Sequence, residues 1–296
     1  VASRVAATDV AGARRVAARA LETINYRNLG ERLAVWRASV RLERDHGSTA
    51  SLDDVVDRAC AANDPETILV DLAAVHEQRN DHARADAAYR RAERTGKKAS
   101  GVSLDTWARH CRERLAAGDH AAARTVLDRA LQALGAPSSA AKKKQKSTDN
   151  KARVELLSRF AVAEFDVGSA ERARTTFDAL LAECPKRLDV WQLYAAQTLK
   201  QRGPSSSNDR DAAASKVDAA RAIFERMVRA PLGRKAAQTA LRRFVEFEKR
   251  YGTEADVARV RQRARDYVDA QKRAAAAAAA QDDDGGSEEE DDGGLE

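Results

Sequence analysis

The sequence predicts an all-α protein built from a repeated pair of helices. Three copies of one phrase begin with tryptophan and reach a turn glycine eleven or twelve residues later: Trp36 and Gly47, Trp107 and Gly118, Trp191 and Gly203. Three more copies begin with leucine: Leu69 and Asn80, Leu157 and Gly168, Leu241 and Gly252. A fixed period of this kind is typical of a solenoid, in which each unit packs only against its neighbours.

The distances between the turn residues give the repeat length. Successive turn residues are 33, 38, 50, 35 and 49 residues apart. Each of the two long steps contains a stretch of loop-like composition. Without these stretches the two steps are 36 and 37 residues long. A period near ~35 residues is that of helix-turn-helix repeats of the tetratricopeptide (TPR) kind. The sequence therefore predicts a right-handed α-solenoid of about six repeats.

The second helix of each unit has a periodicity of its own. One apolar stripe with the spacing of an α-helix consists of Ala170, Ala173, Phe177, Leu180 and Leu181. The same spacing recurs in stripes that begin at Val10, Val217 and Val257. Alternating β-branched runs and Asn-Gly turns are absent from the sequence, which excludes a sheet-based fold.

The predicted domain organisation is one continuous array with tails. Residues 1–30 are the leading helix of a truncated repeat, residues 31–272 are the array, and residues 273–296 are a disordered tail of alanine and acidic residues. Within the array we expect low-complexity loops at 136–151 and 203–215. Because the chain begins inside a helix pair, we expect it to be a piece of a longer protein.

Charge is distributed unevenly along the chain. The net charge is +6, yet the last sixteen residues contain nine acids and no bases. The preceding residues are therefore nine charges more positive than the chain as a whole. A basic array suggests a polyanionic partner, most simply RNA. A solvated solenoid surface would have the same composition, so charge alone does not choose between these interpretations.

Basic clusters outside the repeat pattern are the candidate contacts with RNA or protein partners. They lie in the first predicted loop, at a turn between repeats and in the sixth repeat: Lys142, Lys143, Lys144, Lys146, Lys186, Arg187, Arg234, Lys235, Arg242 and Arg243. No aromatic residue interleaves with them, so base stacking is not indicated. A second set of arginines follows alanine in the second helices: Arg14, Arg124, Arg174, Arg221 and Arg259. We expect these to pack their stems over the helix pair and keep their charges in water.

The sequence lacks the motifs of catalysis and of cofactor or metal binding. It has no phosphate-binding loop, dinucleotide fingerprint or nucleophile elbow. Its histidines show no metal-ligand spacing with the three separated cysteines, which indicate a reducing compartment. The acid that recurs at Glu43, Glu164 and Glu248 is expected to cap a helix or to pair with an arginine of an adjacent helix. We therefore predict no enzyme activity, cofactor, metal, small-molecule substrate or membrane span.

The units resemble half-a-TPR (HAT) repeats, a class found in RNA-processing assemblies. Trp191, Ala195 and the recurring acid match the first-helix pattern, and Ala220–Met227 (ARAIFERM) matches the second-helix pattern. Four segments narrow the match: ARALETINYR (18–27), GSAERARTTFDALL (168–181), CPKRLDVWQLY (184–194) and RRFVEFEKRYGTEADV (242–257). In this order they resemble the C-terminal region of the ribosomal RNA-processing protein 5 family, called programmed cell death protein 11 in animals.

That resemblance covers about residues 10–269 and implies a function. Its members are nucleolar pre-rRNA processing factors, and the similar region serves small-subunit rRNA maturation in the small-subunit processome. It implies a non-enzymatic scaffold that binds pre-ribosomal particle proteins and small nucleolar ribonucleoprotein components. Pre-rRNA would be bound mainly through OB-fold repeats that precede this region in the family.

Two other functions are alternatives to this one. The first is a HAT-repeat subunit of an mRNA splicing or 3′-end processing complex. The second is a peptide-clamp co-chaperone, which would need lysine and asparagine on the first helices to grip a terminal carboxylate. The first helix of the first repeat has Trp36, Arg37, Val40 and Arg41 there, and no such asparagine.

Overall fold

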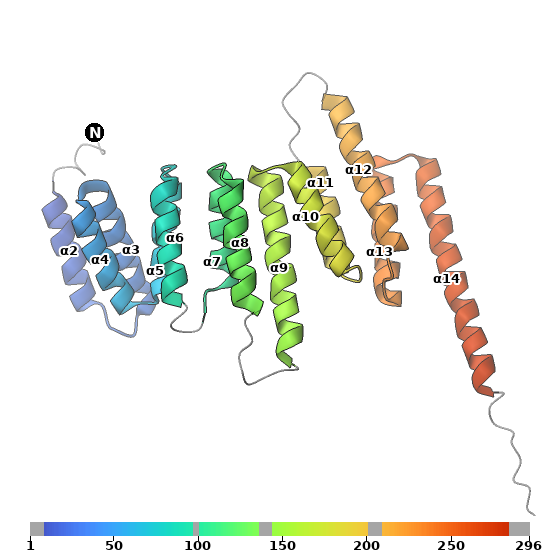
Figure 1. The fold of residues 1–296 in the computed structure, drawn as a ribbon, viewed down its shortest axis with the longest axis horizontal. Helices are drawn as coiled ribbons and strands as arrows, with labels where there is room; N and C mark the ends of the chain where they lie inside the picture. Colours follow the sequence, from blue (N-terminus) through green and yellow to red (C-terminus); the bar gives the residue numbers. More distant parts are fainter. Residues whose placement is uncertain (1–8, 97–100, 136–143, 201–208, 284–296) are drawn as a thin grey trace, which may run out of the picture. The chain divides into compact units, whose positions relative to one another are not determined.

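The computed structural model describes residues 9–96, 101–135, 144–200 and 209–283. These residues form thirteen α-helices and no strand, which confirms the all-α prediction (Figure 1). They divide into two compact units, Val1–Thr176 (unit 1) and Phe177–Glu296 (unit 2), which we describe separately. The hand of the array and its number of repeats stay predictions from the sequence.

A leading helix, α2 (Val10–Thr23), is followed by helices that alternate as first and second members of the predicted repeats. The first helices are α3 (Leu29–His46), α5 (Pro65–Glu77), α7 (Leu104–Ala116), α9 (Lys144–Val167), α11 (Leu188–Lys200) and α13 (Arg234–Tyr251). The second helices are α4 (Thr49–Ala62), α6 (His82–Gly96), α8 (His120–Gly135), α10 (Ala170–Glu183), α12 (Asp209–Arg229) and α14 (Glu254–Asp283). Each repeat predicted from the periodicity therefore contains one such pair.

Local chemistry sets where the helices begin and turn. Ser48 caps α4 in a capping box with Ser51, and Asp64 caps α5 directly before Pro65. Two of the predicted turn residues have a left-handed backbone, Gly118 at φ 77° and Asn80 at φ 56°. Asparagine tolerates this region better than other residues with a side chain, which explains why it can replace the turn glycine.

The tryptophans lie in the core between helices, as the repeat pattern predicts. In unit 1, Trp36 is 7% exposed and Trp107 is 2% exposed, each within a separate cluster of buried apolar side chains. In unit 2, Trp191 is 5% exposed and its Nε1 donates a hydrogen bond to the carbonyl of Pro185 at 3.0 Å. The first-helix aromatic position is thus a packing position in both units.

Aromatic stacking supplies much of the core of unit 2. The ring of Phe224 in α12 stacks on Phe244 of α13 with centroids 5.5 Å apart, and it also contacts Phe247 at 4.8 Å. Phe177 of α10 stacks on Tyr194 of α11 at 4.8 Å. Aromatic pairs at these distances stabilise by more than their buried area alone. They hold α13, which carries a candidate interface, against α12.

Two predicted loops extend too far, and so does the predicted tail. Helix α9 begins at Lys144, inside the loop expected at 136–151, and α12 begins at Asp209, inside the loop expected at 203–215. Helix α14 continues to Asp283 through the alanine run of the tail that was expected from residue 273. Lysine, glutamine and alanine are strong helix formers, so their low complexity does not prevent helix formation. The other residues of these segments lie outside the described residues.

Candidate nucleic-acid interface

The predicted basic residues do not form one site. Lys142 and Lys143 lie outside the described residues, and Lys144 and Lys146 belong to the first turn of α9, where only the backbone is described. Lys186 is exposed in the turn between α10 and α11. Arg234, Lys235, Arg242 and Arg243 all lie on α13. These four form the largest group of predicted residues on one described element, and the only such group on one helix whose side chains are described.

Arg187 forms a local ion pair with Asp189. Its Nε and Nη2 donate hydrogen bonds to Asp189 Oδ1 and Oδ2 at 2.9 and 2.7 Å. This guanidinium lowers the pKa of Asp189, which lies in the first turn of α11. An acid in the first turn of a helix also interacts favourably with the helix dipole. The predicted role of Arg187 in binding a partner therefore competes with a role at the start of α11.

Helix α13 separates apolar and basic side chains onto opposite faces. Its buried residues are Ala237, Ala240, Leu241, Phe244, Phe247 and Glu248. Its exposed bases are Arg234, Lys235, Arg242, Arg243, Lys249 and Arg250, which we call the basic face. Glu246 is the one exposed acid of the helix. Within the described residues, none of the six bases forms an ion pair with a carboxylate. This face can therefore bind phosphates without first breaking internal pairs.

The bases of α13 lie in two rows along the helix. Lys235, Arg242 and Lys249 are seven residues apart, which keeps them on one side of the helix with a step of about 10 Å. Arg243 and Arg250 form a neighbouring row with the same spacing. Sequence reasoning missed Lys249 and Arg250, although their spacing from Arg242 and Arg243 could have revealed them. Both also lie in the last turn, where bases interact favourably with the helix dipole.

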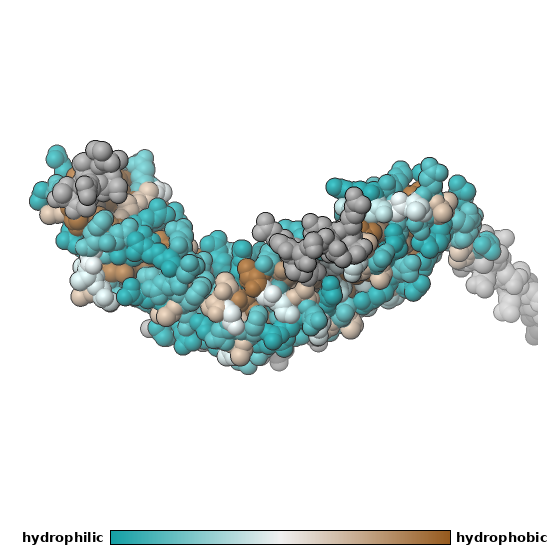
Figure 2. All heavy atoms as spheres, turned by 90° about the horizontal axis from the view of Figure 1, so that it is seen from above, coloured by the Kyte–Doolittle hydropathy of each residue, from teal (hydrophilic) through white to brown (hydrophobic). Residues whose placement is uncertain are grey.

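The surface of the described residues is largely polar. Figure 2 shows that most of the described surface in that view is hydrophilic, with hydrophobic residues confined to small patches. A surface of this kind favours partners recognised by charge and hydrogen bonds rather than by one large apolar patch. Within the described parts of the chain, no helix is long and apolar enough to cross a membrane. The same parts contain no group of three or more His, Cys, Asp or Glu side chains arranged to hold a metal ion.

Arginines that follow alanine in two second helices contribute to internal contacts. Arg14 of α2 binds Glu43 of α3 through two hydrogen bonds of 2.7 and 2.9 Å. Arg221 of α12 binds Glu248 of α13 in the same way at 2.8 and 3.1 Å. The expected pairing of the recurring acid with an arginine of an adjacent helix is therefore confirmed at these two positions.

Arg14 stays exposed as expected, with 48% of its side chain accessible, whereas Arg221 is only 23% exposed, and both arginines also bind a buried carboxylate. The Glu43 and Glu248 side chains are 5% and 0% exposed, and a buried carboxylate needs a charged hydrogen-bond donor. Arg259 of α14, which lies two residues before the stripe position of Arg14 and Arg221, pairs with Asp256 of its own helix at 3.0 Å and remains 58% exposed, as expected. What decides the role of the arginine is therefore whether a buried acid faces it.

A buried histidine between repeats was not found from the sequence. His110 of α7 is fully buried, with Nδ1 2.6 Å from Glu93 Oε1 and Nε2 2.8 Å from Asp86 Oδ1. Its ring stacks on Tyr89 of α6 with centroids 5.0 Å apart. Arg129 of α8 binds the other oxygen of Glu93 at 3.1 Å. Because these groups satisfy one another, we interpret them as a structural link between α6, α7 and α8 rather than a catalytic site.

The fold and the basic face define a helical-repeat protein with an exposed charged surface and largely internal polar contacts. No family model matches the chain. The chain is 32% identical over 268 residues to the mouse protein RRP5 homolog and 34% identical over 265 residues to the human one, covering 90% of the chain in each case. It is 31% identical over 256 residues to the fission yeast rRNA biogenesis protein rrp5, covering 86% of the chain.

The matched residues span only a small part of these relatives. They cover 13% of the mouse and fission yeast proteins and 12% of the human protein. Over the matched residues, this chain belongs to the RRP5 family. The resemblance that four sequence segments indicated is therefore confirmed.

Proposed function

We propose that this chain is a non-enzymatic scaffold in ribosome biogenesis that acts in small-subunit rRNA maturation in the nucleolus. The observation that supports this function most is the match of 90% of the chain to relatives named RRP5 homolog. Two further relatives, from Arabidopsis thaliana and fission yeast, are named rRNA biogenesis proteins. The chain spans about an eighth of the length of these relatives. That it shares their role in ribosome biogenesis is therefore part of the proposal.

The proposed mechanism is recruitment rather than chemistry. The basic face of α13 contacts phosphates of pre-rRNA, and other helix surfaces bind pre-ribosomal particle proteins and small nucleolar ribonucleoprotein components. Phosphate contacts position a protein on RNA without reading its sequence. Phe244 and Phe247, which lie between Arg242 and Lys249 in the sequence, are buried in the core. They cannot stack on bases, which supports this division, because single-stranded bases are usually held by stacking.

Reversing two charges on the basic face tests the proposal in the full-length protein. We expect Arg242→Glu/Arg243→Glu to reduce recovery of small-subunit rRNA precursors with the tagged protein and to impair small-subunit rRNA maturation more than that of the large subunit. The matched control is Arg15→Glu/Arg19→Glu, which reverses two exposed bases of α2. Undiminished recovery by the α13 variant, with normal helical circular dichroism, would remove this face from the mechanism.

The salt dependence of RNA affinity measures the contacts directly. Neutralising Lys235, Arg242 and Lys249 to glutamine should flatten the log–log salt slope by about 2, because each single-strand contact contributes about 0.7. Neutralising Lys142, Lys143, Lys144 and Lys146 should flatten it further if the predicted loop also contacts phosphates. Filter binding at several salt concentrations separates the two clusters. An unchanged slope in both variants would leave them as solvated surface.

A further inference from the structure

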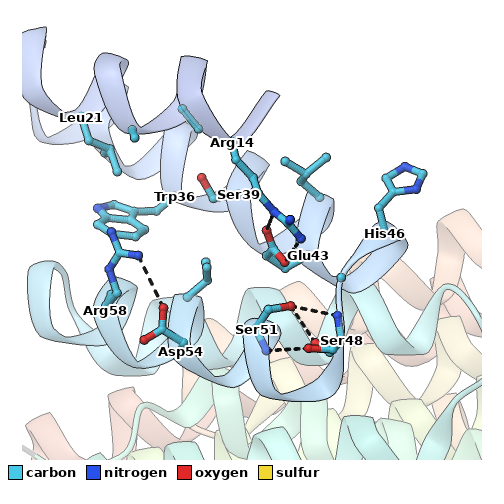
Figure 3. Close-up of a pocket in the computed structure, with 15 residues that line it drawn as sticks. Arg14, Leu21, Trp36, Ser39, Glu43, His46, Ser48, Ser51, Asp54 and Arg58 are labelled. Carbon is cyan, nitrogen blue, oxygen red and sulfur yellow. Dashed lines mark hydrogen bonds and ion pairs between the residues drawn. The ribbon is translucent and has the colours of Figure 1, made fainter. Parts of the chain in front are cut away.

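A groove in unit 1 lies between two consecutive second-position helices, α2 and α4. It has a volume of about 620 Å³, and α3 contributes the residues between the two walls (Figure 3). The wall from α2 includes Ala17, Ala18 and Leu21, and the wall from α4 includes Val55 and Arg58. The small alanine side chains leave room between the helices. The question is why α2 and α4 leave this space open.

Two other pairs of consecutive second helices are joined by an ion pair at one repeated position. Arg91 of α6 binds Asp57 of α4, and Arg226 of α12 binds Asp178 of α10 at 2.8 Å. Both aspartates stand five residues after equivalent buried residues of the apolar stripe, Leu52 in α4 and Ala173 in α10, and Ala13 has that stripe position in α2. The repeat therefore places an acid on one second helix and an arginine on the next.

The groove lacks this acid. Counting five residues from Ala13 in α2 leads to Ala18, so a methyl group stands where Asp57 and Asp178 stand. Arg58 occupies the position of Arg91 and Arg226, but none of the α2 residues that line the groove is an acid. Its ion pair is with Asp54 of its own helix, at 3.5 Å, and the Arg58 side chain is 60% exposed. The guanidinium of Arg58 is thus held only weakly.

Trp36 leaves a second polar group without a partner in the same groove. Trp36 is 7% exposed, and its buried Nε1 has no hydrogen-bond partner among the described residues. Trp191 has the same place in its repeat and satisfies its Nε1 with the carbonyl of Pro185. Arg58 lies 5.7 Å from the Trp36 ring centre, as Arg226 lies 5.5 Å from the ring of Trp191. Figure 3 shows Trp36 between Leu21 and Arg58 in the groove.

We propose that this groove binds an acidic segment of a partner protein, with one carboxylate of the segment in place of the missing aspartate. Arg58 is the charged donor, and the Trp36 indole N–H is a neighbouring donor that becomes accessible when the Arg58 side chain turns toward the carboxylate. An apolar side chain of the segment packs between Leu21 and Val55. Arg14, which also lines the groove, remains bound to Glu43. This inference is independent of the proposed function.

Peptide selection tests this site. The control is a variant that restores the missing aspartate. Random peptides displayed on phage are selected on the 296-residue chain and depleted on the Ala18→Asp variant. Ala18→Asp supplies Arg58 with the internal partner that Arg91 and Arg226 have. We expect the wild-type chain to enrich peptides with an acid next to an apolar residue, and the variant to lose their binding while its thermal midpoint is unchanged or higher.

Single substitutions then separate the donors with one selected peptide. Arg58→Gln should weaken binding about tenfold or more, because it removes a charged hydrogen-bond donor. Arg91→Gln is the matched control, since Arg91 is already paired with Asp57, and it should leave the affinity unchanged. The indole N–H resonance of Trp36, assigned with Trp36→Phe, should shift when the peptide binds. Circular dichroism confirms that each variant is folded.

Three outcomes would overturn the proposal. The first is a selection without wild-type-specific peptides, or one that enriches peptides without acids. The second is equal binding by wild type and a folded Ala18→Asp variant. The third is concentration-dependent self-association of the wild type that Ala18→Asp abolishes, because a second copy of the chain would then be the occupant.

Discussion

Glu43 and Glu164 occupy the same place in two repeats of unit 1, yet their surroundings act on them in opposite ways. Glu43 follows Trp36 by seven residues, and Glu164 follows Leu157, the equivalent of Trp36, by the same distance. Both acids are buried. Two hydrogen bonds from Arg14 lower the pKa of Glu43. Glu164 accepts a hydrogen bond from the Thr176 hydroxyl at 2.9 Å, and burial raises its pKa. The repeat thus fixes a buried acidic position, while the side chains packed against it set the direction of its pKa shift.

A third interface shows that the charges at this position can be exchanged. Between α6 and α7, Asp86 stands where Arg14 and Arg221 stand, and Arg114 stands where Glu43 and Glu248 stand. The two side chains form an ion pair at 3.7 Å. What the interfaces share is complementarity rather than a fixed residue. Complementary pairs of different polarity disfavour the packing of a repeat against the wrong neighbour.

The largest expected effect concerns the tryptophan position seven residues before this polar position. Trp107→Ala and Trp191→Ala should each reduce the free energy of unfolding by about 3–5 kcal/mol, because each empties a buried position between helices. Urea denaturation followed by circular dichroism is the measurement. An unchanged unfolding transition in Trp191→Ala would show that this position does not organise the repeat.

Removing an arginine tests whether the buried acid controls its importance. Arg221→Ala should cost about 3 kcal/mol, because it leaves the fully buried carboxylate of Glu248 without its charged partner. Arg259→Ala removes an exposed arginine of α14 whose ion pair is with Asp256 of the same helix, and it should cost less than about 0.5 kcal/mol. Equal costs in urea denaturation would mean that both arginines act only through packing of their stems.

Periodicity was sufficient to predict the helix pairs and most of the core, but not the starts of α9 and α12 or the end of α14. The stripes that begin at Val10 and Ala170 and the tryptophan positions follow from spacing alone. The individual ion pairs do not follow from spacing, because Arg14 and Glu43 lie 29 residues apart and meet only when α2 packs on α3. The basic face was partly predicted, because four of its bases break the repeat pattern. Lys249 and Arg250 were missed because they also complement the end of α13.

Exchanging the charges of one pair sharpens the comparison with the α6–α7 interface. Arg14→Glu and Glu43→Arg should each destabilise unit 1, because each places like charges together. The double variant reproduces the polarity of Asp86 and Arg114 and should recover about 1 kcal/mol relative to the sum of the two single variants. A double-mutant cycle in urea denaturation gives this coupling. Strict additivity would contradict the view that complementarity is the property retained between repeats.

The smallest expected effect is a difference in pH dependence between Glu43 and Glu164. The pKa of Glu43 is lowered from its ordinary value of 4.5, so the unfolded chain binds its proton more readily than the folded one. Its stabilising contribution is therefore complete above that value and is lost as the pH falls below it. Glu164 has a raised pKa, so the folded chain binds the proton more readily. Its contribution is greatest at low pH and declines as the pH rises above 4.5 toward the raised pKa.

Glutamine variants convert these opposite signs into a measurement. Between about pH 3 and pH 7, the destabilisation caused by Glu43→Gln should increase with pH, whereas that caused by Glu164→Gln should decrease with pH. Each variant is compared with wild type by urea denaturation at the same pH, so that all other titrating groups cancel. Arg14→Gln should remove most of the pH dependence attributed to Glu43, because Arg14 is the largest cause of the lowered pKa. Parallel pH profiles for the two glutamine variants would show that the two interfaces treat the shared acid alike, and the comparison between them would fail.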